Sequence, residues 1–295
     1  MTKYSISTLE KLSGIKAHTI RIWEQRYGVL QPLRTETNIR YYDDNQLKKL
    51  LNIVSLLHNG YRISKISQLT TDELNSKINE IIDKPSKEEG VILALSNQLI
   101  STGLALDLNG FESVFQKIRK EFNTEDTYVQ VLRPMLLKIG LLWTKNKMSP
   151  AQEHFLSNLV RQKLIAAINA LPLPRNEEKK WLLFLPPDEY HEIGLLYAQF
   201  LLRKYDNSTL YLGANVPLSD IDAVVATYKP THVLFFIVKN MTLRNGQKFF
   251  DRIEKEMPNT KIMYGGSNPF LDKLIIPERF IRLNDPESFK REYLG

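Results

Sequence analysis

Few residues of this 295-residue chain could bind a metal. It has no cysteine and only five histidines, so a ligand must be an imidazole or a carboxylate. His191 follows the apolar run 181–185, with Glu189 before it and Gly194 after it. If that run is a parallel strand, His191 lies beyond its carboxyl end, where open sheets bind ligands. A loop histidine is more often solvent-exposed than metal-bound, so this position alone leaves both interpretations open.

A second group of candidate side chains lies earlier in the chain. Trp143 is followed after nine residues by Glu153 and His154, and Ser149-Pro150 between them marks a helix start. A tryptophan ending one helix, with an acid and an imidazole on the next, could together cover a planar ligand. The same residues could equally be a core tryptophan and ordinary side chains on a helix surface.

The elements that must position these residues change along the chain. Apolar residues recur at three- and four-residue steps over 90–170, which predicts a helical bundle. After Lys180, short apolar runs alternate with amphipathic stretches, which predicts a parallel sheet covered on both faces. Polar segments at 71–89 and 171–180 predict connections. The predicted strands are 181–185, 209–212, 232–238 and 261–264. The predicted domains are 1–75, 86–172 and 180–295.

Positive charge is concentrated in the first quarter of the chain. The formal net charge is +7, and residues 1–70 hold eleven Lys and Arg against five Asp and Glu, a balance of +6. This predicts a surface for a polyanion. Ser7 and Glu10 predict a capping box for a short helix. A second helix over 18–25 completes a helix-turn-helix candidate, and residues 30–42 predict a hairpin wing.

The order of these parts resembles the MerR family of winged-helix transcription regulators over residues 4–69. The segments that carry the resemblance are 19–28, Pro32, Arg34 and 38–42. It implies DNA contacts, on the backbone or near base edges, by Lys16, His18, Thr19, Arg21, Arg34, Arg40 and Tyr41. That family usually pairs subunits through a C-terminal coiled coil. No sustained heptad follows Leu69, so dimerisation must come from later parts of the chain.

The two candidate groups together resemble the cobalamin-binding unit of methionine synthases, a four-helix bundle followed by a flavodoxin-like, doubly wound domain. With the N-terminal part, the chain resembles the CarH/LitR type of cobalamin-dependent regulator, in which adenosylcobalamin serves as a light sensor. The resemblance implies that His191 is the lower axial ligand of cobalt. It also implies that Trp143, Glu153 and His154 cover the upper face. The implied cofactor contacts also include Gly194 of the His-x-x-Gly motif. Gly213, Pro217, Gly265 and Gly266 match loops around the nucleotide tail.

The chain departs from the family's pattern in two places. The family loop reads Glu-x-Asp-x-His-x-x-Gly, and here Pro187 and Glu189 replace the two acids. Glu189 would orient the imidazole from a side chain one methylene longer. Where the family has a Ser-x-Leu segment after the third strand, this chain reads Phe236-Ile-Val-Lys239. That segment places bulk and a charge where the nucleotide tail should be threaded.

The sequence therefore predicts a multidomain α and α/β protein that is not an enzyme: a cytoplasmic, homo-oligomeric transcription regulator of double-stranded DNA. Its operator occupancy would be controlled by cobalamin, in the adenosyl form, between the helical bundle and the α/β domain. One alternative is a regulator of the same architecture that has lost cobalamin and responds to a protein partner. Another is a corrinoid-carrying methyltransfer subunit. No apolar stretch is long enough for a membrane span, and residues 1–7 lack a signal-peptide core.

Overall fold

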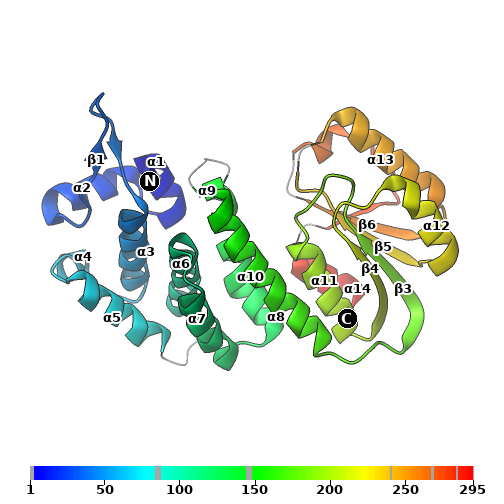
Figure 1. The fold of residues 1–295 in the computed structure, drawn as a ribbon, viewed down its shortest axis with the longest axis horizontal. Helices are drawn as coiled ribbons and strands as arrows, with labels where there is room; N and C mark the ends of the chain where they lie inside the picture. The colour runs from blue at the N-terminus through cyan, green and yellow to red at the C-terminus, as the bar shows by residue number, and fades with distance from the viewer. Residues whose placement is uncertain are drawn as a thin grey trace. The chain divides into compact units, whose positions relative to one another are not determined.

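The structure, a computed structural model, describes residues 3–83, 88–143, 148–239, 241–266, 269–283 and 285–294. It divides into two units, Met1–Leu159 and Val160–Gly295, and the boundary falls inside helix α10. The first unit runs from blue to green in Figure 1. Its elements are α1 (Ile6–Ser13), α2 (Ala17–Tyr27), β1 (Leu33–Arg34), β2 (Arg40–Tyr41), α3 (Asp44–His58), α4 (Ile63–Ile66), α5 (Thr71–Ile82), α6 (Glu89–Ala105), α7 (Leu108–Glu121), α8 (Thr124–Asp126), the π-helix η1 (Thr127–Leu132), α9 (Arg133–Trp143) and the start of α10 (Pro150–Asn169).

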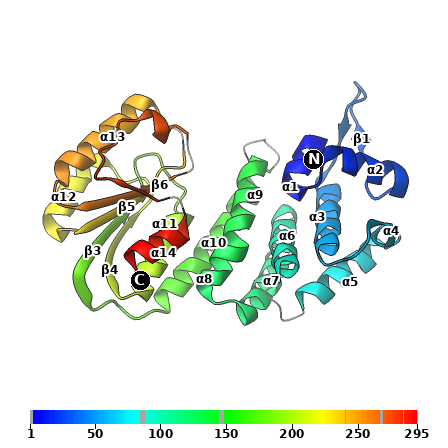
Figure 2. The same cartoon turned by 180° about the vertical axis from the view of Figure 1, so that it is seen from behind.

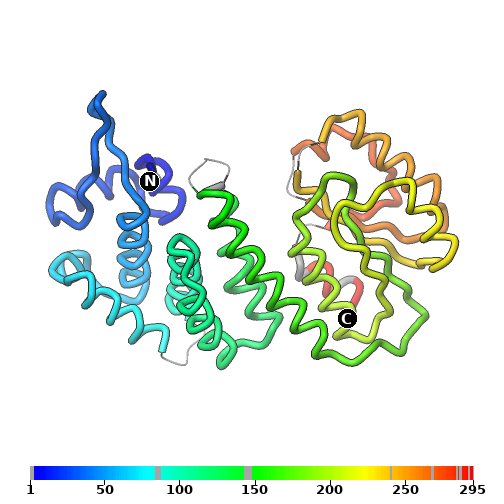
Figure 3. Tube along the Cα trace, in the orientation of Figure 1, coloured from blue at the N-terminus to red at the C-terminus, as the bar shows by residue number. Residues whose placement is uncertain are grey.

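Helix α1 begins two residues earlier than predicted, because Ser5 and not Ser7 is its N-cap. The Ser5 side chain accepts a hydrogen bond from a backbone N–H of the first turn. Glu10 accepts instead from the first N–H of α2, at 3.2 Å, and pairs with Lys16. It therefore joins the two helices of the helix-turn-helix. The hairpin wing formed by β1 and β2 projects beyond these helices (Figure 3).

The prediction of a polar connection over 71–89 was wrong for most of its length, because Thr71–Ile82 is helix α5. Thr70 and Glu73 form a reciprocal capping box at its start. The apolar side chains of α5 are buried, and the helix packs on α3 and α6. Tertiary packing of one apolar face stabilises a helix that its polar composition concealed.

A buried polar cluster joins α3, α6 and α9. Asn97 on α6 donates to the Leu51 carbonyl, at 3.3 Å, and to Ser55 Oγ, at 3.0 Å, both on α3. Lys138 on α9 donates to Asn97 Oδ1 at 2.9 Å, and burial lowers the pKa of its ammonium group. The helix that ends at Trp143 is therefore connected by side chains to the helix that follows the wing.

The described part of the second unit contains a five-stranded parallel sheet in the order β4-β3-β5-β6-β7. This is the flavodoxin-like order, with its reversal point between β3 and β5, and it confirms the predicted doubly wound fold. Helices α11 and α14 cover one face, and α12 and α13 cover the other (Figures 1 and 2). The elements are β3 (Asn176–Phe184), α11 (Ile193–Lys204), β4 (Asn207–Gly213), α12 (Leu218–Tyr228), β5 (His232–Phe236), α13 (Leu243–Glu256), β6 (Lys261–Gly265), the 3-10 turn η2 (Leu271–Lys273), β7 (Ile281–Leu283) and α14 (Pro286–Tyr293).

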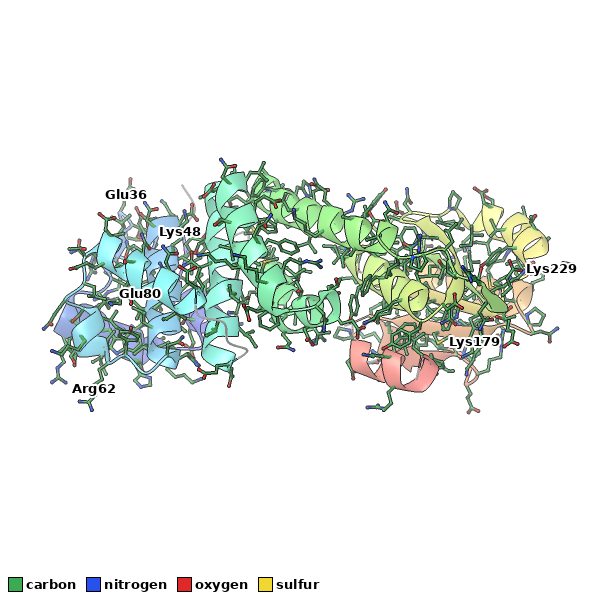
Figure 4. All side chains as sticks on the ribbon, turned by 90° about the horizontal axis from the view of Figure 1, so that it is seen from below. Glu36, Lys48, Arg62, Glu80, Lys179 and Lys229 are labelled. Atoms are coloured by element: carbon green, nitrogen blue, oxygen red, sulfur yellow. The ribbon has the colours of Figure 1, made fainter. Side chains whose placement is uncertain are left out.

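Strand β3 starts five residues before its predicted position. Residues 176–180 belong to the strand and not to a charged linker, and Asn176 pairs with Asn207 of β4. Their side chains are largely exposed, which explains the polar sequence. Lys179, labelled in Figure 4, is one of them, at the amino end of the sheet.

Successive residues of β5 face opposite sides of the sheet. Phe235 packs into the aromatic core under α12 and α13, with its ring centroid 5.0 Å from that of Phe249. Ile237 belongs to the same core. Phe236 therefore points to the α11 side, where its ring lies near Gly194.

His232, the first residue of β5, couples the stability of the second unit to pH. Its ring stacks on Trp181 with 4.6 Å between centroids. Burial, together with the charges of Lys261 and Lys179, lowers the pKa of His232 from its usual 6.5 to about 4. The unfolded chain therefore binds more protons than the folded chain between these pH values, so stability falls as pH falls through this window.

We expect wild-type protein to lose about 1 to 2 kcal/mol more than His232→Phe between pH 7 and 4.5, after allowance for partial exposure of the ring. Phenylalanine keeps the stacking and binds no proton. Hydrogen–deuterium exchange of peptides covering β3 and β5, compared at matched pH so that intrinsic rates cancel, measures the difference. Equal losses in both proteins would show that His232 does not titrate in this window.

Candidate functional site

The loop after β3 brings His191 against Glu189. Nδ1 of His191 lies 2.5 Å from Glu189 Oε1, whose side chain is 1% exposed. Because a carboxylate only accepts, Nδ1 carries a proton, so the lone pair of a neutral His191 ring is on Nε2. This is the arrangement that orients a histidine ligand and increases its basicity toward a metal. The His191 side chain is 59% exposed.

Backbone N–H groups fix the Glu189 carboxylate from two loops. Oε1 also accepts from the N–H of Tyr190 and His191, at 2.9 and 3.0 Å. Oε2 accepts from the N–H of Val238 and Lys239, at 2.7 and 2.6 Å. Burial alone would raise the pKa of Glu189, but the hydrogen bond from the His191 ring, together with those from the N–H groups of Lys239, His191 and Val238, holds it at about 2. Glu189 thus connects the loop after β3 to the loop after β5 at the reversal point of the sheet.

The segment after β4 supports the same loop. Asp188, at φ 63°, donates its N–H to Asn215 Oδ1 at 2.8 Å, and Asn215, at φ 56°, donates its N–H to the Glu189 carbonyl at 3.0 Å. Gly213 has φ 81°, a conformation that favours glycine, and Pro217 is the N-cap of α12. The segment from Gly213 to Pro217 therefore lies beside the loop that carries His191.

Three glycines that the resemblance assigns to the cofactor lie against the protein itself. A Cβ on Gly265 would lie 2.5 Å from the Phe236 ring, and a Cβ on Gly266 would lie 2.2 Å from the Ile237 carbonyl oxygen. A Cβ on Gly194 would be 3.9 Å from the same Phe236 ring. The loop that carries His191 fits a ligand with a metal that can take an imidazole, because an oriented imidazole is present. The residues that the resemblance assigns to the nucleotide tail leave no room for one, because the Phe236 ring lies between Gly194 and Gly265.

A cavity of about 380 Å³ lies beside Glu189, on the side of the sheet opposite to Phe236. It is lined by residues 186–189, by Leu218, by Lys239 and Met241, and by side chains of α13. It therefore lies on the α12 and α13 side of the reversal point, whereas Phe236 lies on the α11 side.

Trp143, Glu153 and His154, which the resemblance assigns to the upper face of the cofactor, belong to the first unit. Ser149 and Gln152 cap the start of α10, and Glu153 and His154 lie in its first turn with 2.7 Å between Oε2 and Nδ1. His154 is 68% exposed. Trp143 ends α9, and its side chain lies outside what the structure describes. Whether these residues and His191 face one ligand stays a prediction.

The predicted DNA contacts lie on α2 and on the wing. Lys16, His18 and Arg21 are exposed at the start and on the outer face of α2, while Ile20 and Trp23 are buried beneath it. Thr19 is half-buried, and its hydroxyl lies 3.3 Å from a nitrogen of His18. Helix α2 therefore presents polar and basic side chains outward, as a helix that enters a DNA groove must.

In the wing, basic side chains have local partners. Arg34 donates to Asn38 Oδ1 at 2.7 Å and so holds the turn at the wing tip, where Asn38 has φ 64°. Arg40 Nε lies 3.9 Å from Glu24, which also accepts from the Tyr42 hydroxyl. Burial, with Glu24 beside it, raises the pKa of Tyr42. Lys3 lies over the ring of Tyr41 at 4.8 Å from its centroid.

Replacing Arg40 by alanine should make the slope of log affinity against log salt shallower by about one unit, because the predicted phosphate contact of Arg40 is lost. Binding to a DNA duplex, titrated at several salt concentrations, measures the slope. Lys229→Ala is the matched control, since Lys229 is exposed beyond α12 in the second unit (Figure 4). An unchanged slope in Arg40→Ala would contradict the assignment of the wing to the DNA-binding surface.

The sequence did not reveal two groups that hold the candidate site residues in place. Glu24 anchors Arg40 and Tyr42, 16 and 18 residues away, and the backbone of residues 238–239 anchors Glu189 from 49 and 50 residues away. No local spacing signals such pairs.

Within the described residues, no group of three or more His, Asp and Glu side chains could hold a bare metal ion. In the same residues, no helix is long and apolar enough to cross a membrane.

Two family models match the chain. Residues 4–73 match the MerR HTH family regulatory protein, and residues 95–167 match a B12 binding domain. The first match covers α1 to the start of α5, and the second runs from within α6 to α10.

Curated relatives resemble most of the chain. The HTH-type transcriptional repressor CarH of Myxococcus xanthus is 27% identical over 257 residues, 86% of this chain and 85% of the relative. The HTH-type transcriptional repressor CarA of the same organism is 27% identical over 237 residues, 79% of this chain and 76% of the relative. Among solved structures, the monomethylamine corrinoid protein of Methanosarcina barkeri has a similar fold. Its TM-score is 0.56 at 13% identity, over 73% of this chain and 98% of that one.

Proposed function

We propose that this chain, a transcriptional regulator with a MerR HTH domain and a B12 binding domain, changes its occupancy of double-stranded DNA when it binds a corrinoid. The observation that carries the proposal is the Glu189–His191 contact of 2.5 Å beyond the carboxyl end of β3. A single oriented imidazole is the ligand set for a metal whose other ligands come from a macrocycle. The similarity to CarH and CarA over most of the chain supports the same function.

In this proposal His191 holds the metal from the second unit, and Trp143, Glu153 and His154 cover the other face. An adenosyl corrinoid would supply a cobalt–carbon bond that light cleaves. The contacts of Lys138 with Asn97, and of Asn97 with Ser55, connect α9 with α3 and support communication between the helical bundle and the helix after the wing. We further propose that the chain works as a homo-oligomer in the cytoplasm, without enzymatic activity.

A selection from random duplex DNA, followed by titration of the selected duplex, tests the DNA half. An absorption spectrum of protein mixed in the dark with adenosylcobalamin or cobinamide and then freed of unbound ligand tests the corrinoid half. Retention of a corrinoid, together with one enriched DNA sequence, supports the proposal. A protein that enriches DNA but retains neither corrinoid favours the regulator that responds to a protein partner.

A further inference from the structure

Phe236 occupies a position that decides what can enter between α11 and the sheet. It ends β5, is half-buried and points to the α11 side. A Cβ built on Gly265 would lie 2.5 Å from two carbons of the Phe236 ring, which is too close for any side chain there with the ring in this position. A Cβ built on Gly194 would lie 3.9 Å from the same ring. One aromatic ring therefore lies against β6 and α11 at the same time.

The backbone at the ends of β5 and β6 also leaves no space between these two strands. The Ile237 N–H donates to the Gly265 carbonyl at 2.9 Å, and the Ile237 carbonyl oxygen lies 2.2 Å from a Cβ position on Gly266. The ends of β5 and β6 are thus in direct contact, and the glycine pair makes that contact possible. Both glycines have a reason within the protein, so they do not by themselves indicate room for a ligand.

The loop that carries His191, residues 186–191, is held by a different set of contacts. Glu189 holds His191 from Nδ1, and the cavity beside residues 186–189 lies on the opposite side from Phe236. Hence the residue that would meet the metal is in place while the route along the α11 side is filled. This combination suits a ligand that needs the imidazole but not the space between α11 and the ends of β5 and β6.

We propose that Phe236 determines which corrinoids this chain accepts: a corrinoid without a nucleotide tail binds at His191 with the ring in place, whereas cobalamin requires displacement of the ring. The inference rests on the proposed corrinoid binding and on the family resemblance, which implies a nucleotide tail beside Gly265. Displacing an aromatic ring from its contacts costs free energy that tail-free corrinoids do not spend. The preferred ligand class is therefore the cobinamide type.

The test measures affinity and absorption spectra for aquocobinamide and aquocobalamin with wild-type protein and Phe236→Ser. We expect the wild type to bind cobinamide at least 10-fold more tightly than cobalamin. Phe236→Ser should gain at least 10-fold for cobalamin and change less than about threefold for cobinamide. Cobinamide also lacks a base that must leave cobalt, so the gain specific to cobalamin in the variant is the decisive value.

Tyr205→Ser is the matched control, because Tyr205 is a half-buried aromatic residue at the other end of α11. It should leave both affinities unchanged. Unaltered cobinamide binding by Phe236→Ser also shows that the variant is folded. Equal wild-type affinities for the two corrinoids, unchanged in Phe236→Ser, would overturn the inference and leave the proposed function standing. Absence of binding by either corrinoid to either protein would overturn the proposed function itself.

Discussion

Replacing Glu189 by glutamine should destabilise the second unit as strongly as replacing it by alanine, by about 3 to 5 kcal/mol. Each carboxylate oxygen accepts at least two hydrogen bonds from N–H groups, and the side chain is 1% exposed. An amide presents N–H₂ to the donors on one side, which leaves two or more of them without an acceptor. Aspartate is one methylene shorter and cannot reach both loops, so it should be intermediate.

Urea unfolding, combined with hydrogen exchange of peptides covering 186–192 and 237–242, measures the effect. Glu178→Gln is the control, because Glu178 is exposed at the start of β3. Corrinoid affinity should fall roughly 10- to 100-fold in Glu189→Gln, as when a ligand's hydrogen-bonding partner is lost. If glutamine proved as stable as the wild type, the connection of the two loops through this carboxylate would be wrong.

Replacing His191 by alanine should remove the nitrogen that we propose binds the metal, and should lower corrinoid affinity by more than the roughly 100-fold that an indirect partner can account for. The absorption of bound corrinoid should change with the loss of histidine coordination. Cobinamide and adenosylcobalamin are tested in parallel in the dark, so that exclusion of the tail is not mistaken for loss of the ligand.

His58→Ala is the matched control, since His58 is an exposed histidine at the end of α3. It should bind both corrinoids as the wild type does. We expect the stability of His191→Ala to equal that of the wild type, because the Glu189 carboxylate keeps its backbone donors. Spectra and affinities of His191→Ala equal to those of the wild type would reject the axial assignment.

Local patterns predicted much of the fold. The alternation of apolar runs with amphipathic stretches after Lys180 predicted the parallel sheet, and the glycine turn between two short helices predicted the helix-turn-helix. Two segments were hidden because their polar residues face solvent. Helix α5 has an inward apolar face among polar residues, and the first residues of β3 are exposed although they pair with β4.

The candidate site was predictable in its residues but not in its contacts. Spacing within the loop placed Glu189 beside His191, since only Tyr190 lies between them. The bonds from Glu189 to the backbone of Val238 and Lys239 depend on how β3 and β5 become neighbours. Phe236 was recognisable as bulk, but the side of the sheet it occupies follows from the register of β5 and from α11.

The central claim is that a corrinoid held by His191 alters DNA binding by residues 4–73. The most direct measurement is the affinity for the selected duplex with and without saturating corrinoid, for wild-type protein and His191→Ala side by side. We expect the wild-type affinity to change by about 5- to 150-fold, the usual range for coupled sites, and the variant's affinity to stay constant. A wild-type affinity that is identical with and without bound corrinoid would contradict the account.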